Sequence, residues 1–222
     1  MRRLIDEQAP DLVCLTEGEV DFIDLPHRMQ SSEDYGMPIK PKRRKVLVWS
    51  RSSWTDIDDV GDAKMPIGRF VSGTCATPLG PLTVHGVCIP WDLAHVRTGR
   101  RDGRPWSEHR AYLAGLSAVV QRRKPLSNTL ILGDFNQAVP RRRAPKAVYD
   151  QLVETIGQQA NIATKGEITG LPFQTIDHLA HSLDLIPVSI QALSNRGEDG
   201  RRLSDHTGLV IRLTRPAGTA EK

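Results

Sequence analysis

The apolar residues of this chain come in short continuous runs, and that shortness limits the folds it can adopt. Leu12-Val13-Cys14-Leu15, Val46-Leu47-Val48-Trp49 and the segment from Asn128 to Leu132 are such runs. Short apolar runs are typical of strands that are buried on both faces. None approaches the roughly 18 consecutive apolar residues of a membrane-spanning helix. The pattern therefore predicts a layered domain built largely of strands.

Helical periodicity is confined to a few segments between these runs. Apolar residues recur at helical spacing from Ser107-Glu108 to about Arg123, residues 144–156 suit a second helix, and residues 1–9 resemble the end of another. Residues 70–77 and 82–89 are rich in β-formers and are joined by Pro78-Leu79-Gly80-Pro81, which predicts a hairpin. Further strands are expected at 175–179, 183–193 and 207–213, and a loop at 26–44. Strands with helices between them favour an α/β or α+β fold.

The length of 222 residues suits one large domain with an ample core. We expect that domain to cover residues 1–214, followed by a flexible tail over 215–222. The cysteines Cys14, Cys75 and Cys88 are odd in number and widely spaced, which indicates buried reduced thiols. Because the first residues carry arginines but no apolar segment, we predict no signal peptide and a cytoplasmic protein without a membrane partner.

Four acidic residues stand at the ends of predicted strands or inside them: Glu17, Asp134, Asp177 and Asp205. An isolated acid at a strand end often only caps a helix or closes a turn. Several carboxylates brought together, however, cannot all ionise without a cation. Oxygen ligands suit a hard metal, and Mg²⁺ typically takes one or two carboxylates together with waters and phosphate oxygens. The four acids are therefore candidates for a magnesium site.

The tetrapeptide Gly133-Asp134-Phe135-Asn136 and two Asp-His pairs carry more specific chemistry. Glycine permits a close backbone approach, while Asp and Asn supply a base or ligand and an amide donor close together. His178 follows Asp177, and His206 follows Asp205. A histidine beside a carboxylate cluster can stay protonated at neutral pH and bind phosphate.

Four segments, in this order, resemble those of the endonuclease/exonuclease/phosphatase superfamily, the family of pancreatic-type deoxyribonucleases and abasic-site endonucleases. Residues 10–17 resemble the segment with the metal-binding glutamate, and Gly133-Asp134-Phe135-Asn136 matches the most recognisable motif. Thr175-Ile176-Asp177-His178 resembles the segment whose aspartate orients the catalytic histidine. Leu203-Ser204-Asp205-His206 matches the terminal Ser-Asp-His motif, so the resemblance spans residues 10–206.

The resemblance implies a four-layer α/β sandwich of two packed sheets with helices on both outer faces. It also implies that Glu17 binds Mg²⁺, with Asp205 as a second ligand or an alternative proton acceptor. Asp134 would position or deprotonate the attacking water, and Asn136 would hold the phosphate and that water. His206, oriented by Asp177, would stabilise the charge growing on the phosphoryl oxygens. Phosphoryl transfer needs positioning and charge neutralisation of this kind.

Two features depart from the family pattern. Members normally open with a strand that carries an asparagine near the metal, whereas residues 1–9 correspond to the helix that follows that strand. We therefore expect either that the start of the chain is misassigned or that the chain is truncated relative to the family, and the missing strand would leave a sheet edge open. Where the family usually has a Tyr or His before a turn, this chain has Cys88. His85 would point to the opposite face of that strand.

Basic and aromatic residues near the motifs are candidates for binding substrate. Arg141, Arg142 and Arg143 closely follow the Gly-Asp-Phe-Asn turn and could contact a nucleic-acid backbone or a polyphosphate, or form only a solvated loop. Trp106 could stack on a base, or could instead seat the start of the helix at 107–123.

These observations predict a phosphoesterase dependent on Mg²⁺, or on Mn²⁺ in its place, that hydrolyses phosphodiester bonds as a nuclease. A phosphomonoesterase acting on a sugar, inositol or nucleotide phosphate is the alternative within the family, because a fold does not determine a substrate. A catalytically inactive, truncated binding module is the alternative outside it. The formal charge of +4 permits a polyanionic partner such as nucleic acid.

Overall fold

The computed structural model describes residues 2–157 and 159–216, and in this part of the chain short strands outnumber helices. The strands are β1 (Leu12–Glu19), β2 (His27–Gln30), β3 (Arg43–Ser50), β4 (Trp54–Asp58), β5 (Phe70–Thr77), β6 (Gly80–Cys88), β7 (Thr129–Asp134), β8 (Ala160–Ile162), β9 (Asp177–Ser182), β10 (Ile186–Leu193) and β11 (Gly208–Thr214). The helices are α1 (Arg2–Asp6), α2 (Ser107–Arg122) and α3 (Lys146–Ile156). The three short apolar runs all lie in strands, as their length predicts.

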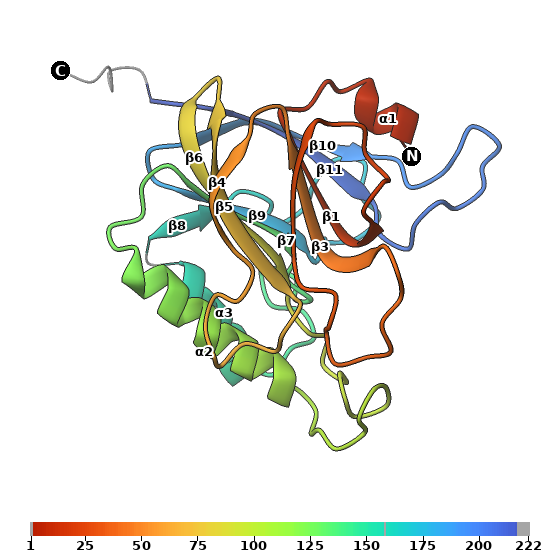
Figure 1. Cartoon of the computed structure of the whole chain (residues 1–222), viewed down its shortest axis with the longest axis vertical. Helices are drawn as coiled ribbons and strands as arrows, with labels where there is room; N and C mark the ends of the chain where they lie inside the picture. Colours follow the sequence, from red (N-terminus) through yellow and green to blue (C-terminus); the bar gives the residue numbers. More distant parts are fainter. Residues whose placement is uncertain (1, 158, 217–222) are drawn as a thin grey trace.

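The strands form two layers that pack against each other (Figure 1). One layer is a six-stranded sheet in the order β4-β5-β6-β7-β9-β8. The other consists of the three-stranded sheet β1-β3-β2 and the two-stranded sheet β10-β11, which share no strand pairing within the described residues. The predicted hairpin is β5-β6, and α2 lies in the crossover that makes β6 and β7 parallel. β9 then runs antiparallel to β7.

Alternation of side chains along the strands builds the layers. On β7, Leu130 faces the core between the sheets, whereas Ile131 faces the core beneath α2 and α3. On β3, Val48 faces the inner core, whereas Trp49 packs outward against Ile5 of α1. The two longer helices therefore cover one outer face and the short α1 covers the other, at opposite sides of Figure 1. This arrangement confirms the predicted α/β sandwich.

The structure has three strands that sequence patterns did not predict: β2, β4 and β8. β2 falls in residues 26–44, which we expected to be a loop, so that prediction is wrong over His27–Gln30. All three lie at an edge of their sheet. Edge strands are short and partly solvated, so they lack the continuous apolar run that marks a central strand.

The C-terminal end of the described chain is attached to the sandwich through Arg215. Its guanidinium donates hydrogen bonds to the Leu79 carbonyl at 2.7 Å and to Asn128 Oδ1 at 2.6 Å, and it pairs with Asp184 at 3.1 Å. Arg215 falls in the segment 215–222 that we expected to be a flexible tail, and residues 217–222 of that segment lie outside the described residues. No helix within residues 2–157 and 159–216 has the length and apolar character to span a bilayer.

Candidate active site

The order of strands in the six-stranded sheet brings two of the predicted acids together. Asp134 is the last residue of β7 and Asp177 is the first residue of β9. Because these strands are antiparallel neighbours, the two aspartates are paired in register. The Phe135 amide continues the pairing by donating to the Ile176 carbonyl at 2.9 Å. Sheet topology therefore places residues that are far apart in the sequence at one end of the sheet.

Gly133 is required for this placement. Its φ is 136°, and a Cβ on it would lie 2.0 Å from the Val87 carbonyl oxygen on β6. A side chain would therefore separate β6 from β7 directly before Asp134. The close backbone approach predicted for this glycine is confirmed.

Asn136 holds the Asp134 carboxylate in place. It has left-handed backbone geometry with φ of 52°, and its amide N donates to Asp134 Oδ1 at 2.8 Å. Its Nδ2 donates to Asp134 Oδ2 and to the Ile89 carbonyl, both at 2.8 Å. These bonds use both hydrogens of the side-chain amide. In this geometry Asn136 contacts and orients the Asp134 carboxylate, and its implied role in holding the phosphate stays a prediction.

Asp177 and His206 form the expected pair. His206 Nδ1 donates to Asp177 Oδ2 at 2.6 Å, and this hydrogen bond is the main cause that raises the pKa of His206 to about 9. The His206 backbone amide donates to Ser204 Oγ at 3.1 Å, which fixes the turn of the Ser-Asp-His motif. With Nδ1 engaged, Nε2 is the nitrogen that His206 can offer to a substrate.

Asp134 is buried, and the pKa of its carboxyl group is shifted by burial and by neighbouring charges. Burial, followed by the like charge of Asp177, raises the pKa of Asp134 to about 7. The His206 charge opposes that shift, and Asp134 in turn raises the pKa of His206. The three side chains are therefore electrostatically coupled, with one cation facing two carboxyl groups.

Glu17 lies on β1 in a strained conformation, with φ of 55°. Lys45 Nζ lies 2.5 Å from Glu17 Oε1, and Arg43 lies 3.4 Å from Oε2. Burial acts to raise the pKa of Glu17, but the Lys45 hydrogen bond and the nearby cations hold it below its usual range. Strained residues of this kind cluster at functional sites.

Asp205 is exposed beside His206. Its charge contributes to the raised pKa of His206. Its carboxylate makes no hydrogen bond or ion pair with any residue that the structure describes. Asp205 therefore borders the site with both oxygens open to solvent.

The donor set at this site fits Mg²⁺ in its chemistry. Within residues 2–157 and 159–216 no three His, Cys, Asp or Glu side chains converge into a complete metal cage. Glu17 nevertheless contributes to the raised pKa of Asp134, so the two carboxylates act on a common region. Mg²⁺ is held by one or two carboxylates and completes its shell with waters and phosphate oxygens. Glu17 is the residue that would hold it here, with Asp205 exposed at the border of the site.

Arg69 is a site residue that the sequence patterns missed. Its side chain is only 6% exposed, its Nη1 lies 3.5 Å from the Cys88 carbonyl oxygen, and its charge helps to lower the pKa of Glu17. Tyr112 fixes the backbone there by donating to the Arg69 carbonyl at 2.9 Å. A single arginine at the start of a strand has no sequence signature, so only the packing reveals it.

The remaining histidine and cysteine candidates are structural. His178 donates from Nε2 to the Gln137 carbonyl at 3.0 Å and its Nδ1 pairs with Thr164 Oγ1 at 2.8 Å, so both nitrogens are used inside the core. His85 is fully buried and stacks on Phe70 at 5.8 Å on the helix side of the sheet, as the strand period predicts. Burial raises the pKa of Cys88 to about 12, which keeps it a neutral thiol next to Asp134.

The candidate substrate residues lie in different places. Trp106 stands at the start of α2, and its ring packs edge-on against the ring of His109 with 5.1 Å between the ring centres. This contact fits the alternative in which Trp106 anchors the start of the helix. Arg141, Arg142 and Arg143 are exposed in the loop that leaves β7 after Asn136. Arg141 donates to the Ala144 carbonyl at 3.1 Å, and the Arg142 guanidinium lies 5.4 Å from the centre of the Phe173 ring.

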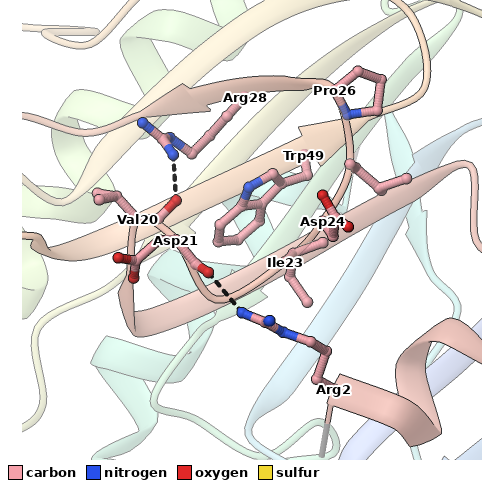
Figure 2. A pocket seen from close by; sticks show the side chains of 9 residues that line it. Arg2, Val20, Asp21, Ile23, Asp24, Pro26, Arg28 and Trp49 are labelled. Carbon is pink, nitrogen blue, oxygen red and sulfur yellow. Dashed lines mark hydrogen bonds between the residues drawn. The ribbon is translucent and has the colours of Figure 1, made fainter.

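A separate pocket of about 570 Å³ lies on the outer side of the β1-β3-β2 sheet, over Trp49 (Figure 2). Arg2 Nη2 donates to the Asp21 carbonyl at 2.7 Å, and Arg28 donates to the Val20 carbonyl. Both arginines therefore hold the turn that follows β1. The pocket has no link to the acidic residues described above.

Comparison with known proteins places this geometry in context. The family model described as the Endonuclease/Exonuclease/phosphatase family matches residues 1–206. The chain is similar to the 3' phosphatase NExo from Neisseria bound to a product DNA hairpin, with 16% identity, a TM-score of 0.67, and coverage of 96% of this chain and 92% of that chain. It is similar to the human Nocturnin catalytic domain with a bound sulfate anion, with 17% identity, a TM-score of 0.64, and coverage of 96% and 85%.

A third similar structure is the endonuclease domain of TRAS1, a telomere-specific non-LTR retrotransposon, with 17% identity, a TM-score of 0.63, and coverage of 96% of this chain and 89% of that chain. At these identities the likeness establishes the fold. A comparison with curated sequences finds no match.

Proposed function

The chain belongs to the endonuclease/exonuclease/phosphatase family, and from this premise we propose that it is a hydrolase that cleaves phosphodiester bonds with Mg²⁺, or with Mn²⁺ in its place. The family name covers both diester and monoester hydrolysis. A single catalytic domain that reaches into β11 would carry the activity. A nucleic acid is the first substrate class to test, since the solved structures of similar fold include an endonuclease domain and a phosphatase bound to DNA.

The observation that carries the proposal is the arrangement of Asp134, Asp177 and His206. His206 is bonded to Asp177 at 2.6 Å and has a pKa of about 9, while burial brings the pKa of Asp134 to about 7. Between these values an ionised carboxylate and an imidazolium coexist in one site. Those are the charge states that a general base and a phosphate-binding cation need.

The residues divide the work of hydrolysis as follows. Asp134, oriented by the amide hydrogens of Asn136, accepts a proton from the water that attacks phosphorus. His206, oriented by Asp177, donates a hydrogen bond from Nε2 to a phosphoryl oxygen as negative charge grows there. A bound Mg²⁺ supplies a Lewis acid that neutralises the phosphate charge. Glu17 would hold the metal, with Asp205 as a second ligand or an alternative proton acceptor, and the charge of the buried Arg69 acts on Glu17.

The proposal is tested by measuring hydrolysis of bis(p-nitrophenyl) phosphate, a 5'-labelled oligonucleotide and p-nitrophenyl phosphate with Mg²⁺, with Mn²⁺ and in excess chelator. We expect diester cleavage that requires the metal and that Glu17→Gln removes by at least tenfold at low metal concentration. Glu154→Gln is the matched control, since Glu154 lies exposed on α3. Full activity in chelator would refute the metal requirement, and cleavage of only the monoester would assign the phosphomonoesterase instead.

A further inference from the structure

A groove of about 840 Å³ lies between two loops, one that follows β7 and one that leads into β9. One wall comes from the chain that leaves β7, with Arg141 and Arg142, and the other from residues 167–174, which lead into β9. The Gly166 amide donates to the Val139 carbonyl at 2.6 Å and joins the two walls. Asp134 ends β7 and Asp177 begins β9, so both walls start within a few residues of the catalytic aspartates.

Phe173 stands in this groove with its ring in solvent. Its exposed fraction is 68%, and it belongs to none of the hydrophobic cores described above. The loop that carries it is nevertheless fixed, because Ile168 is buried at 8% exposure and the Leu171 amide donates to the Ile168 carbonyl at 3.0 Å. A fixed loop therefore presents an aromatic ring that makes no contribution to folding stability through core burial.

The charge around the ring suits a phosphate-bearing partner. The Arg142 guanidinium lies 5.4 Å from the ring centre, within cation–π range, and the exposed Arg141 also lines the groove. Glu167 is the one acidic residue that lines the groove among the described residues. Aromatic faces beside a basic strip are the recognition surface of proteins that bind single-stranded nucleic acid, where bases stack and phosphates are neutralised.

We propose that this groove binds an unpaired nucleotide of the substrate, with its base stacked on Phe173 and its phosphate near Arg141 and Arg142. The proposal rests on the phosphodiesterase function proposed above and names its substrate class as single-stranded nucleic acid. A duplex presents only base edges in its grooves, so its bases cannot offer a face to Phe173. Stacking also tolerates any base sequence, since every base has such a face.

The test measures binding of a fluorescent single-stranded oligonucleotide by anisotropy in excess chelator, so that no cleavage occurs. Phe173→Ala should weaken binding about 5- to 150-fold, the range for loss of one stacked base, whereas Phe173→Trp should retain it. Leu183→Ala, which removes another exposed apolar side chain, is the matched control. Glu167→Gln should strengthen binding, because it removes the negative charge in the groove. The melting temperature of each variant reports on folding.

A second oligonucleotide of equal length, in which every site is abasic, separates stacking from other effects. It carries the same phosphates but no bases, so Phe173→Ala and wild type should bind it equally. An equal loss on both strands, or no loss on either, would overturn the stacking proposal. A wild-type protein that binds the strand through Phe173 but cleaves no phosphoester with Mg²⁺ would instead refute the proposed function alone.

Discussion

The titration ranges of Asp134 and His206 both lie above those of exposed residues of the same type, for different reasons. Burial raises the pKa of Asp134, whereas a hydrogen bond to Asp177 raises the pKa of His206. A base needs a pKa near the working pH, and a phosphate-binding imidazole needs to keep its proton at that pH. One buried end of a sheet satisfies both needs with three side chains.

Substitution of Asp134 and His206 should reveal that they act together. Asp134→Asn removes the base and His206→Ala removes the cation, so each should lower kcat by about 10²–10⁴-fold. The double variant should lose little more than the worse single variant, since groups that stabilise one transition state are not additive. Steady-state kinetics on a diester measures all three variants. Losses that multiply would show that the two residues serve separate steps.

The stability of the metal-free protein should fall as the pH rises from about 5.5 to 9. Asp134 binds its proton more tightly when folded, so its contribution is present below pH 3.8 and is lost as the pH rises through about 7. His206, with an unfolded pKa of 6.5, contributes fully below that value and loses its contribution as the pH rises through about 9. Urea midpoints in chelator measure this fall, and Asp134→Asn should remove its lower part. Stability that rises over the same range would contradict both shifts.

Stabilisation of the protein by bound Mg²⁺ should increase as the pH rises, in contrast to the stability of the metal-free protein. A divalent cation held by Glu17 favours the ionised form of Asp134 through its charge and so opposes protonation of that carboxyl group. The increase in melting temperature on addition of Mg²⁺ should therefore be larger at pH 8 than at pH 5.5, and Glu17→Gln should reduce it at both values. An increase that is independent of pH would show that the cation does not act on Asp134.

Sequence motifs predicted the positions of some residues of the candidate site and missed others. Asp134, Asp177 and His206 belong to local motifs, and the structure brings them together as expected. Arg69 has no motif and was missed, since the effect of its charge on the pKa of Glu17 depends on how the two sheets pack. The contacts of the Asn136 side chain with Asp134 and with the Ile89 carbonyl could not be predicted, because sequence does not show which groups lie within its reach.

At the scale of elements, the central strands could be predicted from sequence, whereas several edge strands could not. β3 and β7 have continuous apolar runs because they are buried on both faces, and their positions follow from sequence. β2, β4 and β8 pair on one side only, so their polar and short sequences resemble loops. The edges matter less for function here, since the candidate site is built where β7 and β9 meet.

Gly133→Ala should test how the β6–β7 junction supports the site. A Cβ at this position would lie 2.0 Å from the Val87 carbonyl oxygen and φ is 136°, so we expect a loss of about 3 kcal/mol or more in the free energy of unfolding. Gly200→Ala is the matched control, because Gly200 also has a positive φ of 77° but no atom near the added Cβ. It should cost about 1–2 kcal/mol. Equal costs would show that the close approach to Val87 relaxes easily.

At the scale of the whole molecule, the helices cover the outer faces of the sandwich, and the candidate site lies at one end of a sheet. α2 and α3 close one outer face and α1 the other, while Asp134 at the end of β7 and Asp177 at the start of β9 carry the chemistry at one end of the six-stranded sheet (Figure 1). The four-layer architecture followed from the resemblance of four motifs in order. The groove beside Phe173 did not, because it arises from two loops that are distant in sequence and carry no shared pattern.

The position of positive charge, and not its total amount, should govern binding of long substrates. Replacing Arg141, Arg142 and Arg143 by Ala leaves a formal net charge of 4 − 3 = +1. Replacing Lys64, Arg123 and Lys124, which lie around the distant end of α2, gives the same charge.

Each phosphate contact contributes about −0.7 to the slope of log affinity against log salt on a single strand. Salt titration of both triple variants compares them at equal charge. The first should flatten the wild-type slope by up to about 2, and the second should leave it unchanged. Equal and shallow slopes in all three proteins would exclude the arginines from the binding path and favour a small phosphomonoester as the substrate.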